Sequence, residues 1–450
     1  MTGRSALFAG RRYAVLGLGR NGLPAARALL AMGAEVVAWD DRERPDGRER
    51  PDGLELRDPA PDIASFDALV LSPGIPHRLP APHPTAAAAL AAGVPVLGDA
   101  ELLFQAVRAS GSQARFVGVT GTNGKSTTTA LVAHVLAAAG RTVAAGGNLG
   151  PAALSLPLLG DDGIYVIEMS SYMLERIESL LFHVAVMLNV SPDHLDRHDG
   201  MAGYVAAKRA IFARQRPGDL AIVGVDDATS RAVAGELRAT TISGERPADA
   251  WCDRGLLRDA HGVMLPMASA PALPGAHNAQ NAAAAAAVAL HLGVARADVA
   301  AGIASFPGLP HRQQRVATID GVPYVDDSKA TNAAAAARAL GCYDRIVWIA
   351  GGIAKAGGVA ALAPYFPRVA HALLIGQDAP LLAADLAGVP HSVAGTLEQA
   401  VPAARGHARR TGADVVLLSP ACASFDQFSG FEARGRRFAE LAQGLAGGPC

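Results

Sequence analysis

The sequence predicts an α/β protein in which mostly parallel sheets are covered by helices and the chain divides into three domains. Short apolar runs alternate with helical stretches along the 450 residues, which is typical of parallel sheets. Two glycine-rich turns each follow an apolar run and precede a helical stretch. Segments near 109–113 and 306–310 are rich in turn-forming residues and mark boundaries. The expected domains are 1–111, 112–308 and 309–450.

The composition excludes several classes of protein. Hydrophobic residues are 50% and charged residues 18%, which indicates a globular chain with a large core. Alanine-rich runs such as 281–289 predict tightly packed helices, and no run of about 20 strongly apolar residues predicts a membrane span. A net charge of −1 gives no general basic surface for nucleic acid. Arg11 and Arg12 interrupt the N-terminal apolar pattern, so we expect no signal peptide and a cytoplasmic location.

The first domain is predicted to begin with a strand, a glycine-rich turn and a helix. Further strands and one helix complete an α/β domain, with expected ranges 12–16, 22–32, 35–39, 68–71, 84–92 and 94–97. Gly17-x-Gly19-x-x-Gly22, with Asp40 about 20 residues later, matches a dinucleotide-binding fingerprint. Because loop amides suit any pyrophosphate and Asp40 suits any sugar hydroxyl or base N–H, both NAD and a nucleotide-sugar diphosphate remain open.

The second glycine-rich turn predicts a site for ATP. It reads Gly118-Val-Thr-Gly-Thr-Asn-Gly-Lys-Ser-Thr127, between the apolar pair 116–117 and a helical stretch over 128–139. Backbone N–H groups and a helix N-terminus would face the phosphates, Lys125 would reach the outer ones, and the Ser126 hydroxyl would lie on Mg²⁺. Val119 stands where the usual pattern has its first glycine. The alternative is a structural turn with an incidental lysine.

Polar residues that follow predicted strands of the second domain are candidates for the chemistry. Glu168 ends the strand 164–168, where a carboxylate beside a phosphate loop can reach Mg²⁺. His194 follows the strand 184–188, and we expect a metal or phosphate role for it, with a hydrogen-bonded loop residue as the alternative. Lys208 lies in a helical stretch and, taken alone, is expected to be solvated.

Two amides and a boundary arginine complete the predicted nucleotide site. Asn278 and Asn281 begin a helix over 278–290 and are spaced to share one face, where amides suit adenine or ribose. An N-cap role for Asn278 is the alternative. In the third domain we expect strands near 315–319, 345–349, 372–375 and 415–418. Arg312 lies at its start, where it could reach ATP, and the polar run 326–332 exceeds what helix capping needs.

Motifs spread along the whole chain resemble the Mur ligases of peptidoglycan synthesis. They are Gly118-Val-Thr-Gly-Thr-Asn-Gly-Lys-Ser, Glu168-x-Ser-Ser, Asn189-Val-x-x-Asp-His-x-Asp196, His277-Asn-x-x-Asn281 and His311-Arg312. Three further features are similar to the members that use D-glutamate. These are the N-terminal glycine loop, Asp327-Ser-Lys-Ala-Thr-Asn332, and Ser419-Pro-Ala-Cys-Ala-Ser-Phe-Asp-Gln-Phe428 followed by Phe431-Glu-x-Arg-Gly435.

The resemblance implies a Rossmann-like domain that binds UDP, a central P-loop-type ATPase and a C-terminal Rossmann-like domain that binds D-glutamate. The implied reaction is ATP-dependent addition of D-glutamate to UDP-N-acetylmuramoyl-L-alanine through an acyl phosphate, giving ADP and phosphate. The implied protein is a monomer without nucleic-acid or membrane partners. The alternatives are another Mur-type or folylpolyglutamate-type ligase, an NAD(P)-dependent dehydrogenase, and a non-catalytic nucleotide-binding module.

The resemblance also implies a role for each matching residue. The UDP substrate would contact Gly19, Arg20, Asn21, Asp40, Arg42, Ser72, Pro73, Gly74 and Asn148. ATP would contact Gly121, Thr122, Asn123, Gly124, Lys125, Ser126, Thr127, Asn278, Asn281, Arg312 and Asp327. D-glutamate would contact Lys329, Thr331, Lys355, Ser424, Phe425 and Phe431. Two Mg²⁺ ions would be held by Ser126, Glu168, His194 and a carbamylated Lys208, and the catalytic set would be Lys125, Glu168, His194 and Lys208.

Overall fold

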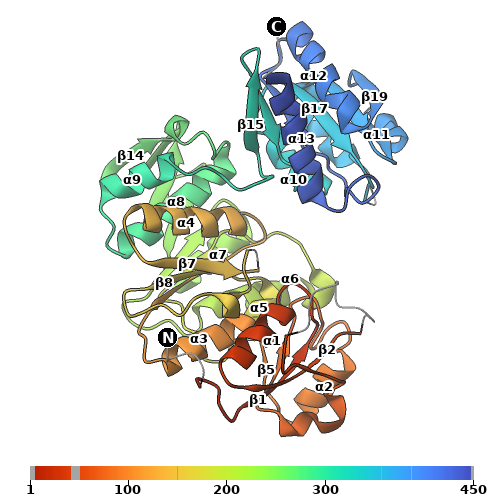
Figure 1. Cartoon of the computed structure of the whole chain (residues 1–450). Helices are drawn as coiled ribbons and strands as arrows, with labels where there is room; N and C mark the ends of the chain where they lie inside the picture. The colour runs from red at the N-terminus through yellow and green to blue at the C-terminus, as the bar shows by residue number, and fades with distance from the viewer. Residues whose placement is uncertain (1–5, 42–50, 149, 356, 387, 447–450) are drawn as a thin grey trace. The chain divides into compact units, whose positions relative to one another are not determined.

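The computed structural model describes residues 6–41, 51–148, 150–355, 357–386 and 388–446 (Figure 1). The chain divides into two compact units. The first consists of Met1–Ala270 and Ala276–Phe306, and the second of Pro271–Gly275 and Pro307–Cys450. The longer segment of the second unit begins within the predicted boundary segment 306–310. Three α/β sheets confirm the predicted fold class.

The first sheet has five parallel strands in the order β3-β2-β1-β4-β5. The strands are β1 (Arg12–Leu16), β2 (Glu35–Trp39), β3 (Glu55–Leu56), β4 (Ala68–Leu71) and β5 (Val96–Leu97). The helices of this part are α1 (Gly22–Ala31), α2 (Pro84–Ala91) and α3 (Asp99–Ala109), with the short 3₁₀ helix η1 (Ala60–Ser65). The chain crosses from one side of β1 to the other, so the β1–α1 turn lies where ligands bind in such sheets.

The core of the first sheet continues into the central one. Tyr13 and Val15 of β1 face the larger core, whereas Ala14 and Leu16 face a smaller core beneath α2, as the two-residue period of a strand requires. The larger core also contains apolar residues from α3 and from the central sheet. Because this core is continuous, the predicted boundary near 109–113 does not separate compact units, and the bounds of the first two domains stay a prediction.

The central sheet has nine strands in the order β14-β13-β12-β11-β10-β9-β6-β8-β7. They are β6 (Arg115–Thr120), β7 (Val143–Gly147), β8 (Ile164–Glu168), β9 (Val184–Met187), β10 (Leu220–Gly224), β11 (Thr240–Ser243), β12 (Ala250–Asp253), β13 (Leu256–Asp259) and β14 (Gly262–Pro266). All neighbours from β7 to β12 are parallel, and β13 and β14 add an antiparallel edge that the sequence analysis did not predict.

Helices of the central part place its polar residues. They are α4 (Lys125–Ala138), α5 (Ser171–Leu174), α6 (Gly200–Arg209), α7 (Ala228–Leu237), α8 (Ala276–His291) and α9 (Arg296–Ala304), with the 3₁₀ helices η2 (Ala153–Ser155), η3 (Leu195–Arg197), η4 (Ala210–Phe212) and η5 (Met267–Ser269). The alanines at 282–286 of α8 are fully buried, as predicted for a tightly packed helix. Among the described residues, no helix is long and apolar enough to cross a membrane.

The second unit contains a six-stranded sheet in the order β15-β16-β20-β17-β18-β19. Its strands are β15 (Gln314–Ile319), β16 (Val322–Asp326), β17 (Ile346–Gly351), β18 (Val369–Ile375), β19 (His391–Gly395) and β20 (Val415–Leu418). Only the β15–β16 pair is antiparallel. The helices are α10 (Ala333–Leu340), α11 (Ala379–Asp385), α12 (Leu397–Thr411) and α13 (Phe431–Ala446), with 3₁₀ helix η6 (Ala360–Arg368). One core lies under α12 and α13, and the other under α10 and α11 (Figure 1).

Candidate active site

The loop between β6 and α4 has the backbone shape of a phosphate cradle. Gly121 has a φ of 151°, and Gly124, which precedes the first residue of α4, has a φ of 84°. A Cβ atom on Gly124 would lie 2.6 Å from Asn281 Oδ1, so the close approach and the positive φ both require glycine. The helix has no side-chain cap from this residue. N–H groups of its first turn therefore point toward the loop, an arrangement that suits a phosphate anion.

The cradle is anchored to the end of the neighbouring strand β9. Asn123 N donates to Asn189 Oδ1 at 2.9 Å, and Asn189 Nδ2 donates back to the carbonyl oxygen of Asn123 at 3.0 Å. The amide of Thr122 donates to the carbonyl oxygen of Asn189 at 2.9 Å. The shape of the loop is therefore set by Asn189, about 65 residues further along the chain. Thr127 follows the loop, in the first turn of α4.

Two lysine amines meet at one carbonyl of this loop. Lys125 Nζ donates to the carbonyl oxygens of Gly121 and Thr122 at 2.9 and 3.0 Å, and Lys208 Nζ donates to Gly121 at 2.8 Å. Lys208 is 1% exposed, so the prediction of a solvated lysine was wrong. Burial, followed by repulsion from Lys125, lowers the pKa of Lys208 to about 6. Lys208 is therefore a neutral amine at pH 7.

Glu168 lies beside the cradle, as the strand order predicts. It pairs in register with Val119 of β6 and is 2% exposed. Asn148 Nδ2 donates to Glu168 Oε1 at 2.9 Å, and the buried Oε2 atom has no hydrogen-bond partner. A buried carboxylate oxygen without a partner is unfavourable unless a cation or donor completes it, so Glu168 fits a Mg²⁺ ligand. The structure places Asn148 against this carboxylate.

His194 lies on an exposed loop after β9. Its backbone is left-handed, with a φ of 51°, and its ring lies 5.3 Å from the ring of Tyr172. Its Nε2 atom lies 3.4 Å from a carboxylate oxygen of Asp193. In the described parts of the chain, no group of three or more His, Cys, Asp or Glu side chains is placed to hold a metal ion. The metal roles predicted for Ser126, Glu168, His194 and a carbamylated Lys208 stay predictions.

The amides of α8 lie against the first turn of α4. Asn281 Oδ1 accepts a hydrogen bond from Thr128 Oγ1 at 3.0 Å, and Asn281 Nδ2 donates to Asn278 Oδ1 at 3.1 Å. Both asparagines are buried on one helix face, as their spacing predicts. Because α8 begins at Ala276, Asn278 lies inside the helix, and the alternative of an N-cap was wrong.

The glycine loop of the first sheet is held by two polar side chains. Asp40 Oδ2 accepts from Leu18 N at 2.7 Å, and Ser72 Oγ donates to the carbonyl oxygen of Gly17 at 2.8 Å. A Cβ atom on Gly22 would lie 1.7 Å from that same carbonyl oxygen, so the turn cannot close around a larger residue. Gly19 lies at the partly exposed tip of the turn.

This loop approaches the end of β7 in the central sheet. Arg20 Nη2 donates to the carbonyl oxygen of Gly150 at 3.4 Å, and Asn21 Nδ2 lies 3.5 Å from both Asp99 Oδ2 and the carbonyl oxygen of Gly147. The structure therefore brings Arg20 and Asn21 close to the segment that carries Asn148. Arg42 of the same predicted set lies outside the described residues.

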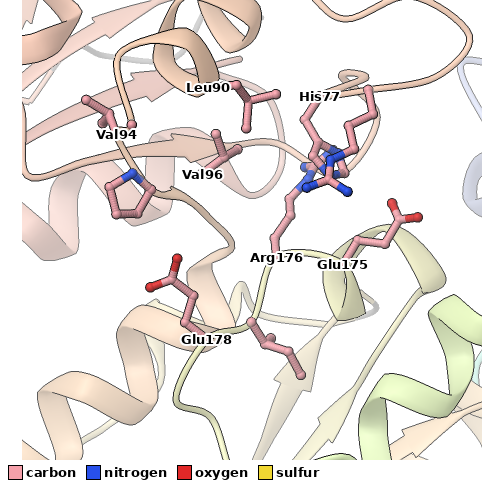
Figure 2. Close-up of a pocket in the computed structure, with 11 residues that line it drawn as sticks. His77, Leu90, Val94, Val96, Glu175, Arg176 and Glu178 are labelled. Carbon is pink, nitrogen blue, oxygen red and sulfur yellow. The ribbon is translucent and has the colours of Figure 1, made fainter.

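Arg176 supports the loop that contains Ser72, Pro73 and Gly74. Its guanidinium donates to the carbonyl oxygens of Leu71, Ser72 and Ile75 at 3.0, 3.0 and 2.6 Å. Burial lowers the pKa of Arg176 to about 10, so it stays charged. Figure 2 shows Arg176 extending toward His77 from the segment after α5, along a cavity of about 280 Å³ that also borders β5. The sequence analysis did not identify this arginine, because its carbonyl partners lie about 100 residues away.

Comparison with known proteins identifies the family. The Mur ligase middle domain matches residues 119–289, and the Mur ligase glutamate ligase domain matches residues 311–422. A protein of Paramagnetospirillum magneticum named UDP-N-acetylmuramoylalanine–D-glutamate ligase is 49% identical in an alignment of length 448 that covers 97% of each chain. The chain belongs to the Mur ligase family. A protein of the same name from Caulobacter vibrioides is 48% identical over 98% of this Mur ligase and 97% of its own length.

Solved structures share the fold of this Mur ligase at lower identity. UDP-N-acetylmuramate-alanine ligase from Thermotoga maritima gives a TM-score of 0.60 at 17% identity, covering 96% of this chain and 99% of that one. MurF from Acinetobacter baumannii gives a TM-score of 0.58 at 19% identity, covering 97% of this chain and 91% of that one. At these identities the likeness concerns the fold alone, and it agrees with the predicted three-domain α/β architecture.

The second unit of this Mur ligase gathers three loops around one buried arginine. Arg434 Nε donates to Ser328 Oγ at 2.9 Å, and its Nη atoms donate to the carbonyl oxygens of Gly351, Ser328 and Cys422. Burial lowers its pKa to about 10. The motif containing Arg434 was noted in the sequence, but no role was predicted for this residue. Its bonds hold together the loops that carry most of the predicted D-glutamate residues.

The predicted D-glutamate residues lie on these loops with different exposures. The ammonium of Lys329 lies 5.2 Å from the ring centre of Phe431, and Thr331 follows on the same loop. Lys355 is exposed, on a segment joined at Ile353 to the loop that contains Ser424. Ser424 is buried, whereas Phe425 is 72% exposed. The structure thus places these residues around one end of the third sheet.

Asp327 directly follows β16, and Arg312 lies just before β15, the strand that pairs with β16. Ser419 Oγ donates to Asp327 Oδ2 at 2.8 Å, and Gln313 N donates to Oδ1 at 3.3 Å. Burial raises the pKa of Asp327 to about 7, and Arg312 opposes this shift electrostatically. These two residues are therefore neighbours in the second unit, and their predicted contact with ATP stays a prediction.

Proposed function

We propose that this Mur ligase joins D-glutamate to UDP-N-acetylmuramoyl-L-alanine at the expense of ATP, in the cytoplasm and as a monomer. The observation that carries the proposal is the near-full-length likeness, at 48–49% identity, to two ligases of that name. The buried groups around the phosphate loop support it, because they fit the transfer of a phosphoryl group. The predicted domains 1–111, 112–308 and 309–450 would bind the UDP substrate, ATP and D-glutamate.

The phosphate loop would bind the triphosphate and position it for attack by the carboxylate of the muramoyl-alanine substrate. A carboxylate oxygen attacks the γ-phosphorus, ADP leaves, and an acyl phosphate forms. Such transfers depend on positioning and on charge stabilisation more than on covalent participation by the protein. Lys125 now donates to two loop carbonyls, and a phosphate would offer it a charge-assisted and therefore stronger acceptor.

The amide bond would form in the second step. The D-glutamate amine attacks the acyl carbon, a tetrahedral intermediate forms, and phosphate leaves with the C–O bonding pair. The residues of this chain proposed to hold D-glutamate are Lys329, Thr331, Lys355, Ser424, Phe425 and Phe431. Lys329 and Lys355 would supply positive charge for carboxylates, and the face of the Phe431 ring lies 5.2 Å from the Lys329 ammonium.

Two Mg²⁺ ions would offset the negative charge that gathers during phosphoryl transfer. The buried, unpartnered Oε2 atom of Glu168 is the observation that supports a cation here. Ser126, at the second position of α4, would supply a hydroxyl ligand, and His194 an imidazole. Asn148 holds the other Glu168 oxygen, and this bond orients the carboxylate.

Lys208 would enter this set as a carbamate. A neutral amine attacks the carbon of CO₂, an N–C bond forms, and a proton is released. The pKa of about 6 makes the neutral amine of Lys208 the main form at pH 7. Carbamylation would turn this neutral amine into an anion that attracts the Lys125 ammonium. We expect a carbamate signal from the protein in carbon-13 bicarbonate by nuclear magnetic resonance, and its absence in Lys208→Met.

Phosphate release tests the proposed reaction. The protein would be given ATP, Mg²⁺, UDP-N-acetylmuramoyl-L-alanine and, in separate reactions, D-glutamate, L-glutamate, D-aspartate or no amino acid. We expect release that requires the UDP substrate and is fastest with D-glutamate, together with a product heavier by one glutamyl residue. Release that ignores the amino acid, or that prefers another one, would contradict the proposal.

A further inference from the structure

His198 lies buried where three segments with predicted metal ligands meet. It follows η3, four residues after His194, and its side chain is fully buried. Its partners, Ser171 and Glu175, belong to the segment that continues from Glu168 into α5. Its ring also packs against Tyr204 of α6, the helix that carries Lys208. The sequence analysis did not identify His198, and the proposed mechanism gives it no role.

Both ring nitrogens of His198 are engaged. Nδ1 lies 3.0 Å from Glu175 Oε1, and Nε2 lies 2.9 Å from Ser171 Oγ. An ionised carboxylate can only accept, so Nδ1 carries the proton and donates it to Glu175. Nε2 then accepts the hydroxyl proton of Ser171. These two bonds join the loop after β9 to the segment after β8.

Aromatic rings extend this connection to the phosphate loop. The His198 ring stacks on Tyr172, with centroids 5.3 Å apart and planes within 10°. Tyr172 in turn lies against His194, and its face carries the guanidinium of Arg197 at 4.6 Å. On the other side of His198, the hydroxyl of Tyr204 lies 3.2 Å from Thr122 Oγ1 in the phosphate loop.

Two other roles for His198 conflict with the geometry. A metal ligand needs a ring nitrogen with a lone pair that is free for the ion, and both nitrogens are occupied. The Ser171–His198–Glu175 series has the order of a hydrolytic triad, but Ser171 is 4% exposed and cannot meet a substrate. What remains is a connection between two segments.

The loop after β9, which contains His194 and ends at His198, has a backbone that needs to be held in place. His194 and Asp199 both have positive φ angles, 51° and 55°, which residues other than glycine adopt unfavourably. His194 is exposed, and its Nε2 atom lies 3.4 Å from a carboxylate oxygen of its neighbour Asp193. Thr122 holds the start of this loop through hydrogen bonds to the backbone of Ser191, and the buried ring of His198 anchors its other end.

We propose that His198 is a positioning residue that ties the loop bearing His194 to the segment bearing Glu168, and so sets the separation of two predicted Mg²⁺ ligands. The inference rests on the proposed ATP-dependent ligation. His198 touches neither nucleotide nor metal in this role. It acts through Ser171 and Glu175, as residues behind metal ligands do.

The test compares the buried His198 with a partly buried histidine of the same unit. His198→Phe keeps a ring and removes both hydrogen bonds. The matched control is His183→Phe, because His183 precedes β9 at the opposite end of that strand and accepts a 3.0 Å hydrogen bond from Phe116 N. Mn²⁺ would replace Mg²⁺, and its binding in the presence of ATP would be measured by electron paramagnetic resonance, which needs no turnover.

For His198→Phe we expect the Mn²⁺ dissociation constant to rise by roughly 10- to 100-fold, the range for groups that orient metal ligands. For His183→Phe we expect a change below about twofold, even though this variant also loses a hydrogen bond, one that is partly buried, and also melts at a lower temperature. His198→Gln, whose amide can donate to Glu175 and accept from Ser171, should recover part of the affinity. Ser171→Ala, which removes one of the bonds, should give an intermediate rise.

Wild-type Mn²⁺ affinity in folded His198→Phe and Ser171→Ala would overturn the inference, as would an equal loss in His183→Phe. If His198→Phe does not fold, Ser171→Ala alone decides. Metal binding and the ligase reaction are measured separately. Weaker Mn²⁺ binding in His198→Phe would support the positioning role. If the wild type then showed no D-glutamate-dependent phosphate release, the proposed reaction would be rejected while the positioning role stood.

Discussion

Two turns of the same local design lie in different surroundings in this Mur ligase. Gly17–Gly22 follows β1 and leads into α1, and Gly121–Gly124 follows β6 and leads into α4. The first turn is held by Asp40 and Ser72 and contains a single charged side chain, that of Arg20. The second is held by Asn189 and lies beside two lysine amines and a buried carboxylate.

The difference teaches that the surroundings of a glycine loop, and not its backbone alone, separate binding from chemistry. A loop of amides and a helix N-terminus can hold a pyrophosphate at either site. Charge must be moved and stabilised only where phosphoryl transfer occurs, and the second loop is the one beside which two lysine amines and the unpartnered oxygen of Glu168 lie. Changes at the second loop should therefore alter rate, and changes at the first should alter substrate affinity.

The largest effect is expected at Lys125. Lys125→Met keeps the length of the side chain and removes the cation that would meet the outer phosphates. The kcat for phosphate release should fall by roughly 1000-fold, the scale of lost transition-state charge stabilisation. Arg141→Met is the control, because Arg141 is an exposed cation beyond the far end of α4 and should leave kcat unchanged. A Lys125→Met enzyme that kept its kcat and lost only affinity for ATP would remove the distinction between the loops.

The positions of both loops could be predicted from the sequence, and the groups that activate the second one could only partly be predicted. Strand, glycine turn and helix are local patterns, and Glu168 follows from its place at a strand end. The burial of Lys208 depends on how α6 packs, and the same helical stretch would be solvated in another setting. Arg176, His198 and Arg434 act through partners up to 106 residues away, so no local spacing marks them. The antiparallel edge at β13 and β14 was missed for a related reason, since short strands carry little periodicity.

A smaller effect, on affinity, is expected at the first loop. Asp40→Asn keeps an oxygen that can accept from Leu18 N and removes the charge that would meet a sugar hydroxyl or base N–H. The KM for the UDP substrate should rise by about 10-fold, the loss of one charged hydrogen bond, with kcat within about twofold. Asp67→Asn is the matched control, because Asp67 Oδ2 accepts from Arg12 N at 2.8 Å at the opposite edge of the same sheet. A fall in kcat without a change in KM would give the first loop a part in the chemistry.

The smallest effect concerns the free energy of unfolding. The second loop, unlike the first, has a buried lysine amine beside it, and burying that amine costs stability. An unfolded lysine keeps its proton up to about pH 10, whereas folded Lys208, with its pKa of about 6, releases it. Between these values the unfolded state binds more protons, so the wild-type protein loses stability as the pH falls from 10 toward 6.

Lys208→Met carries no such penalty and should melt a few degrees higher, roughly 3 °C, at pH 7 in bicarbonate-free buffer, with the difference shrinking toward pH 10. Arg209→Met, on the exposed side of the same helix, should show no such pH-dependent gain. A Lys208→Met protein that melted below the wild type at pH 7 would mean that the bond from Lys208 to the Gly121 carbonyl outweighs the burial of the amine, and the second loop would then gain stability from its lysine.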